Sequence, residues 1–209
     1  MPLLDLIFPP RCDGCGRHGF AWCGSCAATI EAIDATSLAG VPVIAAGRLA
    51  GPLQAAIHTY KYAGRTQVAG PLAALLAAAV RRQDPHIRAL TFVPLHPARR
   101  RERGFNQAER VAAELGRQLS LPVVDGLERV RATQAQVGLT QVERNLNLAG
   151  AFRWSANGPP PKGLALVDDV CTTGATLLAS AEAVSLAGGT ISAFLVVARA
   201  QSLPALAVT

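Results

Sequence analysis

The sequence predicts an α/β protein with a mainly parallel central sheet flanked by helices and a small cysteine-rich module at the amino-terminal end. Three observations support this prediction. Short apolar segments alternate with longer segments of helical periodicity, as in proteins built from strand–helix–strand units. The segment 164–169 is apolar on both faces, which is typical of a central strand in a parallel sheet. Four of the five cysteines lie within residues 12–26.

Composition and charge set the broad class of the protein. The 209 residues are enough for one ordinary domain with a small appendage, and a hydrophobic content of 50% is enough for a buried core. The formal net charge of +6 favours polyanionic ligands such as nucleic acid or phosphorylated metabolites, although the same charge also serves solubility. Residues 1–10 lack the basic region of a secretory signal, and the longest purely apolar run, 72–80, is too short to cross a bilayer. We therefore expect a cytoplasmic protein with reduced cysteines and no membrane insertion.

The amino-terminal module, which we place at residues 1–34, carries two C-x-x-C pairs separated by seven residues. Its cysteines are Cys12, Cys15, Cys23 and Cys26. Each pair can place two sulfurs on one tight turn, and we expect Gly14, Gly16 and Gly24 to supply the positive φ angles of such turns. A Zn²⁺ ion held by four thiolates would provide folding energy that so short a segment cannot gain from a core. The spacing thus predicts a structural zinc site with His18 as a loop residue; redox-active or incidental cysteines are the alternative.

The remaining residues, 35–209, form the predicted α/β domain. The elements expected in its first half are a strand pair or strand and turn around Gly47 (41–49), a helix ended by Gly64 (51–64), an alanine-rich helix (71–83) and a strand ended by Pro94 (89–95). The first helix is predicted by Leu53, Ile57 and Tyr60 at helical spacing. The second begins with a proline, which suits the first turn of a helix.

The second half of this domain alternates in the same way. Its expected elements are a helix (104–119), a strand (121–127), an edge strand (149–154), a loop (155–163), a strand (164–169), a helix (173–189) and a strand (190–198). The helix over 104–119 places Ala108, Ala112 and Leu115 on one apolar face. The polar segment 129–147 shows no core pattern.

Two adjacent carboxylates, Asp168 and Asp169, close the strand over 164–169, at the edge where the ligands of parallel sheets collect. The residues that lead from there into the next helix include Thr172, Thr173, Gly174, Ala175 and Thr176. Their N–H groups and hydroxyls would surround a phosphate at the positive end of the helix dipole, and Gly174 would allow close approach. Because carboxylates are strong acceptors for sugar hydroxyls, one loop would hold a ribose 5-phosphate by both ends. The alternative is a solvated turn, and neither the P-loop pattern nor G-x-G-x-x-G is present.

This stretch, with an apolar strand, two acids and then Thr-Gly-x-Thr, resembles the phosphoribosyl-pyrophosphate (PRPP) binding loop of type I phosphoribosyltransferases. The wider chain is similar to the competence ComF family. The similarity rests on a four-cysteine module, VPLHPARRRERGFNQA, LTQVERNLNLAGAF and LALVDDVCTTGAT in that order. It covers residues 3–197 and is most specific in the Arg-Gly-Phe-Asn-Gln stretch at 103–107. The resemblance implies a type I phosphoribosyltransferase-like fold for the α/β domain.

The resemblance also implies roles for residues of the site. Asp168 and Asp169 would be the catalytic acids that hold the ribose hydroxyls of PRPP, and the loop over 172–176 would hold its 5-phosphate. The segment 94–100 corresponds to the pyrophosphate loop. Further PRPP or anion contacts are expected from Lys61, Arg65, Arg99, Arg100 and Arg144. Mg²⁺ is implied because a divalent ion that bridges diphosphate and ribose oxygens neutralises the departing charge.

Other residues receive weaker assignments from the resemblance. The segment 129–147 corresponds to a mobile hood that closes over such sites and excludes water, and Arg144 and Asn147 fit the family's Arg-x-x-Asn pattern. His96 is the candidate for a general base. Cys171 lies inside the phosphate loop but is expected to pack rather than to react.

Two functions remain open at this stage. The first is a ComF-like protein with a phosphoribosyltransferase domain that binds PRPP and Mg²⁺ and acts in natural competence and DNA uptake, either as a transferase with an unidentified acceptor or as a binding module for incoming single strands. Its expected partners are PRPP, single-stranded DNA and a competence helicase or other single-strand DNA-processing proteins. The DNA phosphates would contact Arg99, Arg100, Arg101 and Arg103. The second is a salvage or biosynthetic phosphoribosyltransferase that acts on a small-molecule acceptor and has no DNA role. An aromatic content of 5% argues against a platform of many stacked rings.

Overall fold

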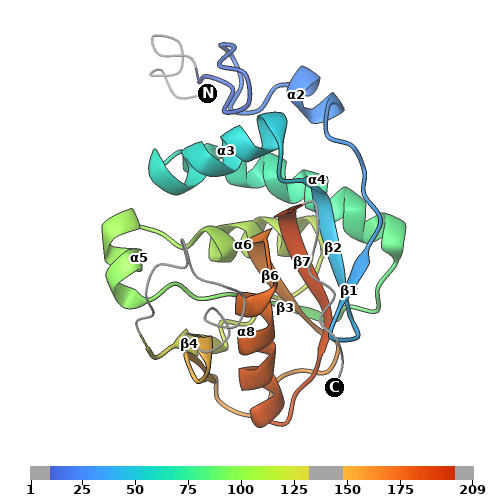
Figure 1. The fold of residues 1–209 in the computed structure, drawn as a ribbon, viewed down its shortest axis with the longest axis vertical. Coiled ribbons are helices and arrows are strands. Elements are labelled where there is room, and N and C mark those ends of the chain that lie inside the picture. Colours follow the sequence, from blue (N-terminus) through green and yellow to red (C-terminus); the bar gives the residue numbers. More distant parts are fainter. Residues whose placement is uncertain (1–9, 132–147, 201–209) are drawn as a thin grey trace.

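A five-stranded sheet forms the centre of the protein in a computed structural model that describes residues 10–131 and 148–200 (Figure 1). The strands are β1 (Thr36–Leu38), β2 (Val41–Arg48), β3 (Ala89–Phe92), β6 (Leu164–Cys171) and β7 (Ile191–Arg199). Their order is β1-β2-β7-β6-β3; β1 runs antiparallel to β2, and the other neighbours are parallel. The prediction of an α/β fold with a mainly parallel sheet is therefore confirmed.

The first hairpin differs from the expectation of a turn around Gly47. The turn lies earlier, at Ala39 and Gly40, whose φ angles are 50° and 80°, and β2 continues unbroken through Gly47. A Cβ atom on Gly47 would lie 2.6 Å from Cγ2 of Ile30. The glycine therefore permits close packing against the segment that leaves the cysteine module.

Helices cover both faces of the sheet (Figure 1). The principal helices are α3 (Gly51–Tyr62), α4 (Ala69–Gln83), α6 (Gln107–Leu119) and α8 (Ala175–Leu186), with a 3₁₀ turn at Thr66–Val68. α4 and α6 pack against each other on one face, and α8 lies on the opposite face. The predicted apolar faces are buried: Leu53, Ile57 and Tyr60 of α3, and Ala108, Ala112 and Leu115 of α6. The Tyr60 hydroxyl donates a hydrogen bond of 3.2 Å to the Gln107 carbonyl oxygen, which fastens α3 to the start of α6.

The segment expected as a strand over 121–127 is reduced to a single parallel bridge between Val123 and Leu90. The Leu90 N–H donates to the Pro122 carbonyl oxygen and the Val124 N–H donates to the Leu90 carbonyl oxygen, both at 2.8 Å. The chain around Val123 thus runs beside β3, at the edge of the sheet, for only a few residues. The connection that leaves β3 passes through α6 on one face, whereas the connection that leaves β6 passes through α8 on the other. The crevice between the ends of β3 and β6 is therefore a topological switch point.

A second, two-stranded sheet stands apart from the main one. It pairs β4 (Leu127–Arg129) antiparallel with β5 (Phe152–Trp154). The edge strand expected over 149–154 is thus present but pairs with β4 rather than with the main sheet. The helix expected over 104–119 also changes, because a short helix, α5 (Pro97–Arg103), precedes it and ends at Gly104 with a φ of 78°. α6 then begins after Asn106, whose side chain accepts a hydrogen bond from the Ala108 N–H.

The cysteine module packs on the end of the α/β unit near α3 (Figure 1). It contains a bridge between Arg11 and His18 and the short helix α2 (Gly24–Ala28). An Arg65 nitrogen lies 2.5 Å from Oδ1 of the buried Asp13 side chain, and Trp22 packs against both the cysteines and the main core. Among residues 10–131 and 148–200, the helices are all too short or too polar to cross a bilayer.

Candidate functional site

The four cysteine sulfurs form one cluster. The Sγ atoms of Cys12 and Cys26 are 3.7 Å apart, as are those of Cys15 and Cys23, and all four lie within 4.8 Å of one another. A zinc ion with Zn–S bonds of about 2.3 Å at the centre of a tetrahedron requires sulfurs about 3.8 Å apart. The side chains of residues 10–26 therefore fit a four-thiolate metal site, and they can bind a metal such as zinc.

Backbone donors support negative charge on this cluster. The Cys23 N–H donates to Cys12 Sγ at 3.3 Å, and the Cys26 N–H donates to Cys23 Sγ at 3.5 Å. Burial raises the pKa of the Cys12 thiol, but the N–H donors around its sulfur outweigh burial and bring that pKa down to about 6. The expectation for the three glycines is only partly correct, because Gly16 alone has a positive φ. Gly14 instead leaves room for Cys26 Sγ, which would lie 2.8 Å from a Cβ atom there.

The paired aspartates lie where β6 extends beyond its neighbour. β3 pairs with β6 only as far as Val167, whereas the pairing of β6 with β7 continues to Cys171. The strand is thus two residues longer than the sequence predicted, and Asp168 and Asp169 lie inside it rather than at its end. Past Val167 no strand of the described residues pairs with the β3 side of β6, so both aspartates lie beside this switch point.

The two aspartates differ in their partners. Lys61 Nζ, from the last turn of α3, lies 2.8 Å from Asp169 Oδ1, and the two side chains are 22% and 11% exposed. Burial lowers the pKa of Lys61, but the charge of Asp169 outweighs it, so the net pKa is raised. The Asp168 Oδ1 atom accepts a hydrogen bond from the Asp169 N–H at 2.8 Å. Burial and the Asp169 charge raise the pKa of Asp168 to about 7, against the opposing charge of Lys61.

The loop over 172–174 carries β6 into α8, as predicted. Gly174 has a φ of 80°, and a Cβ atom there would lie 2.4 Å from Leu38 Cδ2 on β1. Only glycine fits this position, because both the backbone angle and the neighbouring side chain exclude a larger residue. The Thr173 hydroxyl accepts a hydrogen bond of 3.5 Å from the Ala175 N–H. The first-turn N–H groups of α8, which have no partner within the helix, therefore face the same end of the sheet as the aspartates.

The arginine-rich segment forms α5 instead of an open loop. His96 caps this helix, because its Nδ1 accepts the Ala98 N–H at 3.3 Å. Asn106 fixes the following turn by donating to the Val93 carbonyl oxygen at 3.0 Å. Arg99 and Arg101 are exposed, and an Arg100 nitrogen lies 3.0 Å from Glu109 Oε2. The sequence prediction did not anticipate this ion pair.

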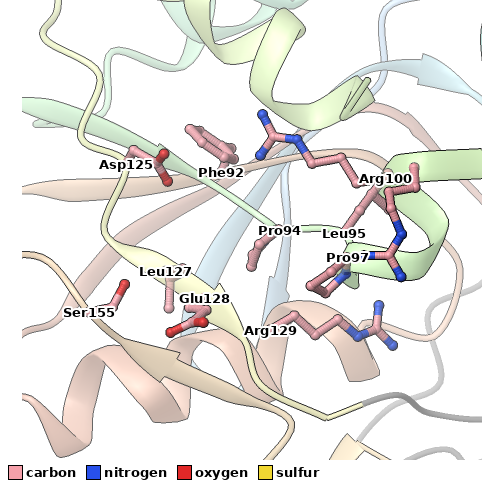
Figure 2. Close-up of a pocket in the computed structure, with 11 residues that line it drawn as sticks. Phe92, Pro94, Leu95, Pro97, Arg100, Asp125, Leu127, Glu128, Arg129 and Ser155 are labelled. Atoms are coloured by element: carbon pink, nitrogen blue, oxygen red, sulfur yellow. The ribbon is translucent and has the colours of Figure 1, made fainter. Parts of the chain in front are cut away.

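A pocket of about 540 Å³ opens between α5 and the β4–β5 sheet (Figure 2). Its lining comprises Phe92, Pro94, Leu95, Pro97, Arg100, Arg101, Asp125, Leu127, Glu128, Arg129 and Ser155. The apolar side chains come from the end of β3 and from β4, and the guanidinium groups come from α5 and Arg129. The volume falls within the range of small-molecule sites.

Sequence reasoning missed Arg129, which it grouped with an unpatterned polar segment. Its guanidinium carbon lies 5.4 Å from the centre of the Phe152 ring. Burial and the charge of Arg99 lower the pKa of Arg129, whereas Asp168 opposes this shift. Arg129 thus connects the pocket electrostatically to the aspartate pair. The only sequence signal was its position two residues after the short apolar segment over 121–127.

Other predicted residues are separated from this site or are not placed. Arg65 pairs with Asp13 of the cysteine module, so it serves the junction of the two parts. Cys171 is buried in the core, and burial raises the pKa of its thiol to about 12, in keeping with a packing role. Arg144 and Asn147 lie outside the described residues.

The fold and the cysteine cluster define a class: a mixed α/β protein with a mainly parallel sheet and an amino-terminal four-thiolate site. No family model matches the chain. It is 33% identical over 183 residues to Competence protein F of Haemophilus influenzae. The alignment covers 79% of this chain and 80% of that protein. It is 30% identical over 185 residues to the DNA utilization protein YhgH of Escherichia coli K12, with 83% of this chain and 75% of the relative aligned. The chain therefore belongs to the competence protein F (ComF) family.

Proposed function

We propose that the protein is a phosphoribosyltransferase-like member of the ComF family that binds PRPP with Mg²⁺ and acts in DNA uptake. The observation that carries the proposal is the end of β6, where two carboxylates precede a loop that leads into the amino-terminal end of α8. Carboxylates accept hydrogen bonds from ribose hydroxyls, and a helix start binds phosphate. The two halves of a ribose 5-phosphate match these two chemistries.

The 5-phosphate is assigned to the loop over 172–176. The threonine hydroxyls supply further donors, and Gly174 keeps the backbone open to close approach. Lys61, which pairs with Asp169, is proposed to contact the diphosphate together with Arg99 and Arg100 of α5. Arg100 must leave Glu109 to do so, because it pairs with that carboxylate without a ligand.

Magnesium fits the same site in its ligand chemistry. Asp168 and Asp169 offer carboxylate oxygens, which are the ligands this ion prefers. When bound with PRPP it would neutralise charge on the diphosphate. The raised pKa of Asp168 supports this assignment, because a half-buried acid beside another acid gains from a cation.

The DNA role is proposed from the relatives. One is named Competence protein F and others DNA utilization protein, and the aligned residues of this chain are 33% and 30% identical to the two relatives described above. The net charge of +6 and the exposed arginines of α5 are suited to sequence-independent contact with DNA phosphates. We propose single-stranded DNA as the nucleic-acid partner, with DNA-processing proteins of the uptake machinery as further partners.

The second candidate is a phosphoribosyltransferase that acts on a small-molecule acceptor. The pocket between α5 and β4 favours it, because its volume and apolar walls suit a small ring and its rim carries donors and acceptors (Figure 2). Release of pyrophosphate from PRPP with a panel of nucleobases and amines would support this function. Binding of PRPP without release for any acceptor would favour the first.

The aspartate pair provides the test of PRPP binding. Asp168→Asn with Asp169→Asn keeps the side-chain size but removes the charge, and each hydrogen bond to a charged group is worth about 1.5–3 kcal/mol. We expect PRPP affinity, measured by titration calorimetry with magnesium, to fall by about two orders of magnitude or more. The control is Asp84→Asn at the exposed end of α4, which should bind as the wild type does. Wild-type affinity in a folded double variant would refute the proposal.

A further inference from the structure

Tyr62, the last residue of α3, presents an aromatic ring to solvent. Its side chain is 70% exposed, although Tyr60, two residues earlier, is fully buried. In the described part of the chain, Phe20 in the cysteine module is the one other strongly exposed ring among phenylalanine, tyrosine and tryptophan, at 60%. Exposing so large a ring forgoes the stabilisation that burial would provide.

An arginine and a histidine lie beside this ring. The guanidinium carbon of Arg103 lies 5.4 Å from the centre of the Tyr62 ring, within the range of a cation–π contact. The His58 ring lies one helical turn earlier, with its centre 4.9 Å from that of Tyr62 and an interplanar angle of 48°. Arg103 belongs to α5, so the contact joins the arginine-rich helix to the end of α3. Because the ring remains largely exposed, its surface is open to a further planar group.

The position of the ring links it to the proposed PRPP site. The neighbouring residue, Lys61, forms the ion pair with Asp169, and the charge of Arg103 acts on Lys61 as well. The exposed arginines Arg99 and Arg101 lie on the same short helix as Arg103. An anionic strand that follows α5 would therefore reach the Tyr62 ring at the carboxyl-terminal end of that helix.

We propose that Tyr62, together with Arg103 and His58, forms a stacking platform for a base of single-stranded DNA whose phosphates contact the arginines of α5. The proposal rests on the DNA role proposed above and assigns it a base-binding residue. Charge complementarity selects this occupant, because the Arg103 guanidinium lies against the ring, Arg99 and Arg101 are exposed on the same helix, and the chain carries a net charge of +6. Aromatic and guanidinium planes both accept stacked bases of any sequence.

The test separates contact with bases from contact with phosphates. Fluorescence anisotropy would compare a labelled oligothymidylate with an abasic strand of the same length. Tyr62→Leu should weaken binding of the oligothymidylate about tenfold, the order of one base stack, and leave binding of the abasic strand unchanged. Tyr62→Phe should bind as the wild type does, because it keeps the ring. Leu186→Ala removes another strongly exposed apolar side chain, 84% exposed on α8, and should have no effect.

The slope of log affinity against log salt provides a second readout. Tyr62→Leu should leave that slope unchanged, because the variant still binds the same phosphates. The platform would be overturned by an equal loss of affinity for both strands or by no loss of affinity for either. It would also be overturned by a change in sedimentation that shows Tyr62 joining two copies of the chain. If the wild-type protein binds both strands equally, the platform fails and the DNA role survives. If it binds neither strand, the DNA role itself fails.

Discussion

Lys61 Nζ lies 2.8 Å from Asp169 Oδ1, and this ion pair joins the last turn of α3 to the carboxyl-terminal part of β6. The neighbouring Asp168 has no such cation at contact distance among the described ion pairs, and its pKa rises to about 7. Two adjacent acids of one strand thus lie in different electrostatic environments. Pairs of acids whose environments separate them in this way are typical of functional sites.

The raised pKa of Asp168 predicts a pH dependence of stability. The pKa in the folded chain, about 7, lies above the ordinary value of 3.8, so the folded state binds the proton more tightly than the unfolded state. The stabilisation from this proton is fully present below pH about 4 and is lost as the pH rises through about 7. We expect Asp168→Asn to raise the melting temperature at pH 8 and to leave it nearly unchanged at pH 4.

A matched variant checks this assignment. Glu182→Gln removes an exposed carboxylate from α8 and should change the melting temperature little at either pH. If Asp168→Asn shifts the melting temperature equally at both pH values, the titrating group is not Asp168. A loss of stability at pH 8 would contradict the sign of the effect.

The cysteine cluster predicts one zinc ion per chain in protein purified under reducing conditions. Removal of the metal should loosen the cysteine module, proposed to span residues 1–34, and leave the α/β domain at 35–209 folded. The physical reason is that the sheet has its own buried core, whereas the module depends on its thiolates and on contacts such as Asp13 with Arg65. Metal analysis and hydrogen exchange before and after chelation would measure both effects.

The cysteine pairs provide the matching variants for the zinc prediction. Cys12→Ser with Cys15→Ser should abolish stoichiometric zinc. Cys171→Ser alters the fifth cysteine, which lies in the core away from the cluster, and should retain the metal. Full zinc occupancy in the double serine variant would exclude these thiolates as the ligands.

Much of the main sheet was predictable because its strands are continuous apolar segments of the sequence. The strands over 164–169 and 190–198 were correctly identified from continuous apolar segments, and the faces of α3 and α6 from their spacing. The turn before β2 was misplaced because Gly47 was taken for a turn residue. Its actual role, close packing against Ile30, depends on a residue that is distant from it in the sequence.

The site was predictable only where its chemistry is contiguous in the chain. The aspartates and the loop over 172–176 form one segment, so their proximity required no tertiary information. The ion pair of Lys61 with Asp169 spans more than a hundred residues, and the pair of Arg100 with Glu109 joins α6 to a segment that was expected to be a loop. Such partners depend on how helices pack, which periodicity does not determine.

Gly174→Ala should destabilise the protein by two separable effects. The φ of 80° costs a residue with a Cβ about 1–2 kcal/mol, and the contact with Leu38 adds about 1–3 kcal/mol of overpacking. Gly188→Ala is the control, because Gly188 has a φ of 82° but nothing within 4 Å of the added Cβ. Denaturant unfolding should therefore show a larger loss for Gly174→Ala than for Gly188→Ala.

A double variant isolates the contact with Leu38. Leu38→Ala alone empties a buried site on β1 and should itself destabilise the protein. Combined with Gly174→Ala, the total loss should be smaller than the sum of the two single losses, because the shorter side chain gives the new Cβ room. Strict additivity would show that the two positions do not contact each other.

The exposed arginines of α5 yield a prediction for DNA binding that depends on salt. A triple alanine variant of Arg99, Arg100 and Arg101 should bind single-stranded DNA more weakly. The slope of log affinity against log salt should fall by about 0.7 for each phosphate that the variant no longer binds. The control changes three cations that precede the amino-terminal ends of β3 and β6, namely Arg82, Arg88 and Lys162. It removes the same net charge from the opposite end of the parallel strands. If charge alone attracts the strand, both triple variants will lose affinity and slope equally. If α5 forms the binding surface, only the first variant will do so, and an unchanged slope there would show that α5 contacts no phosphate.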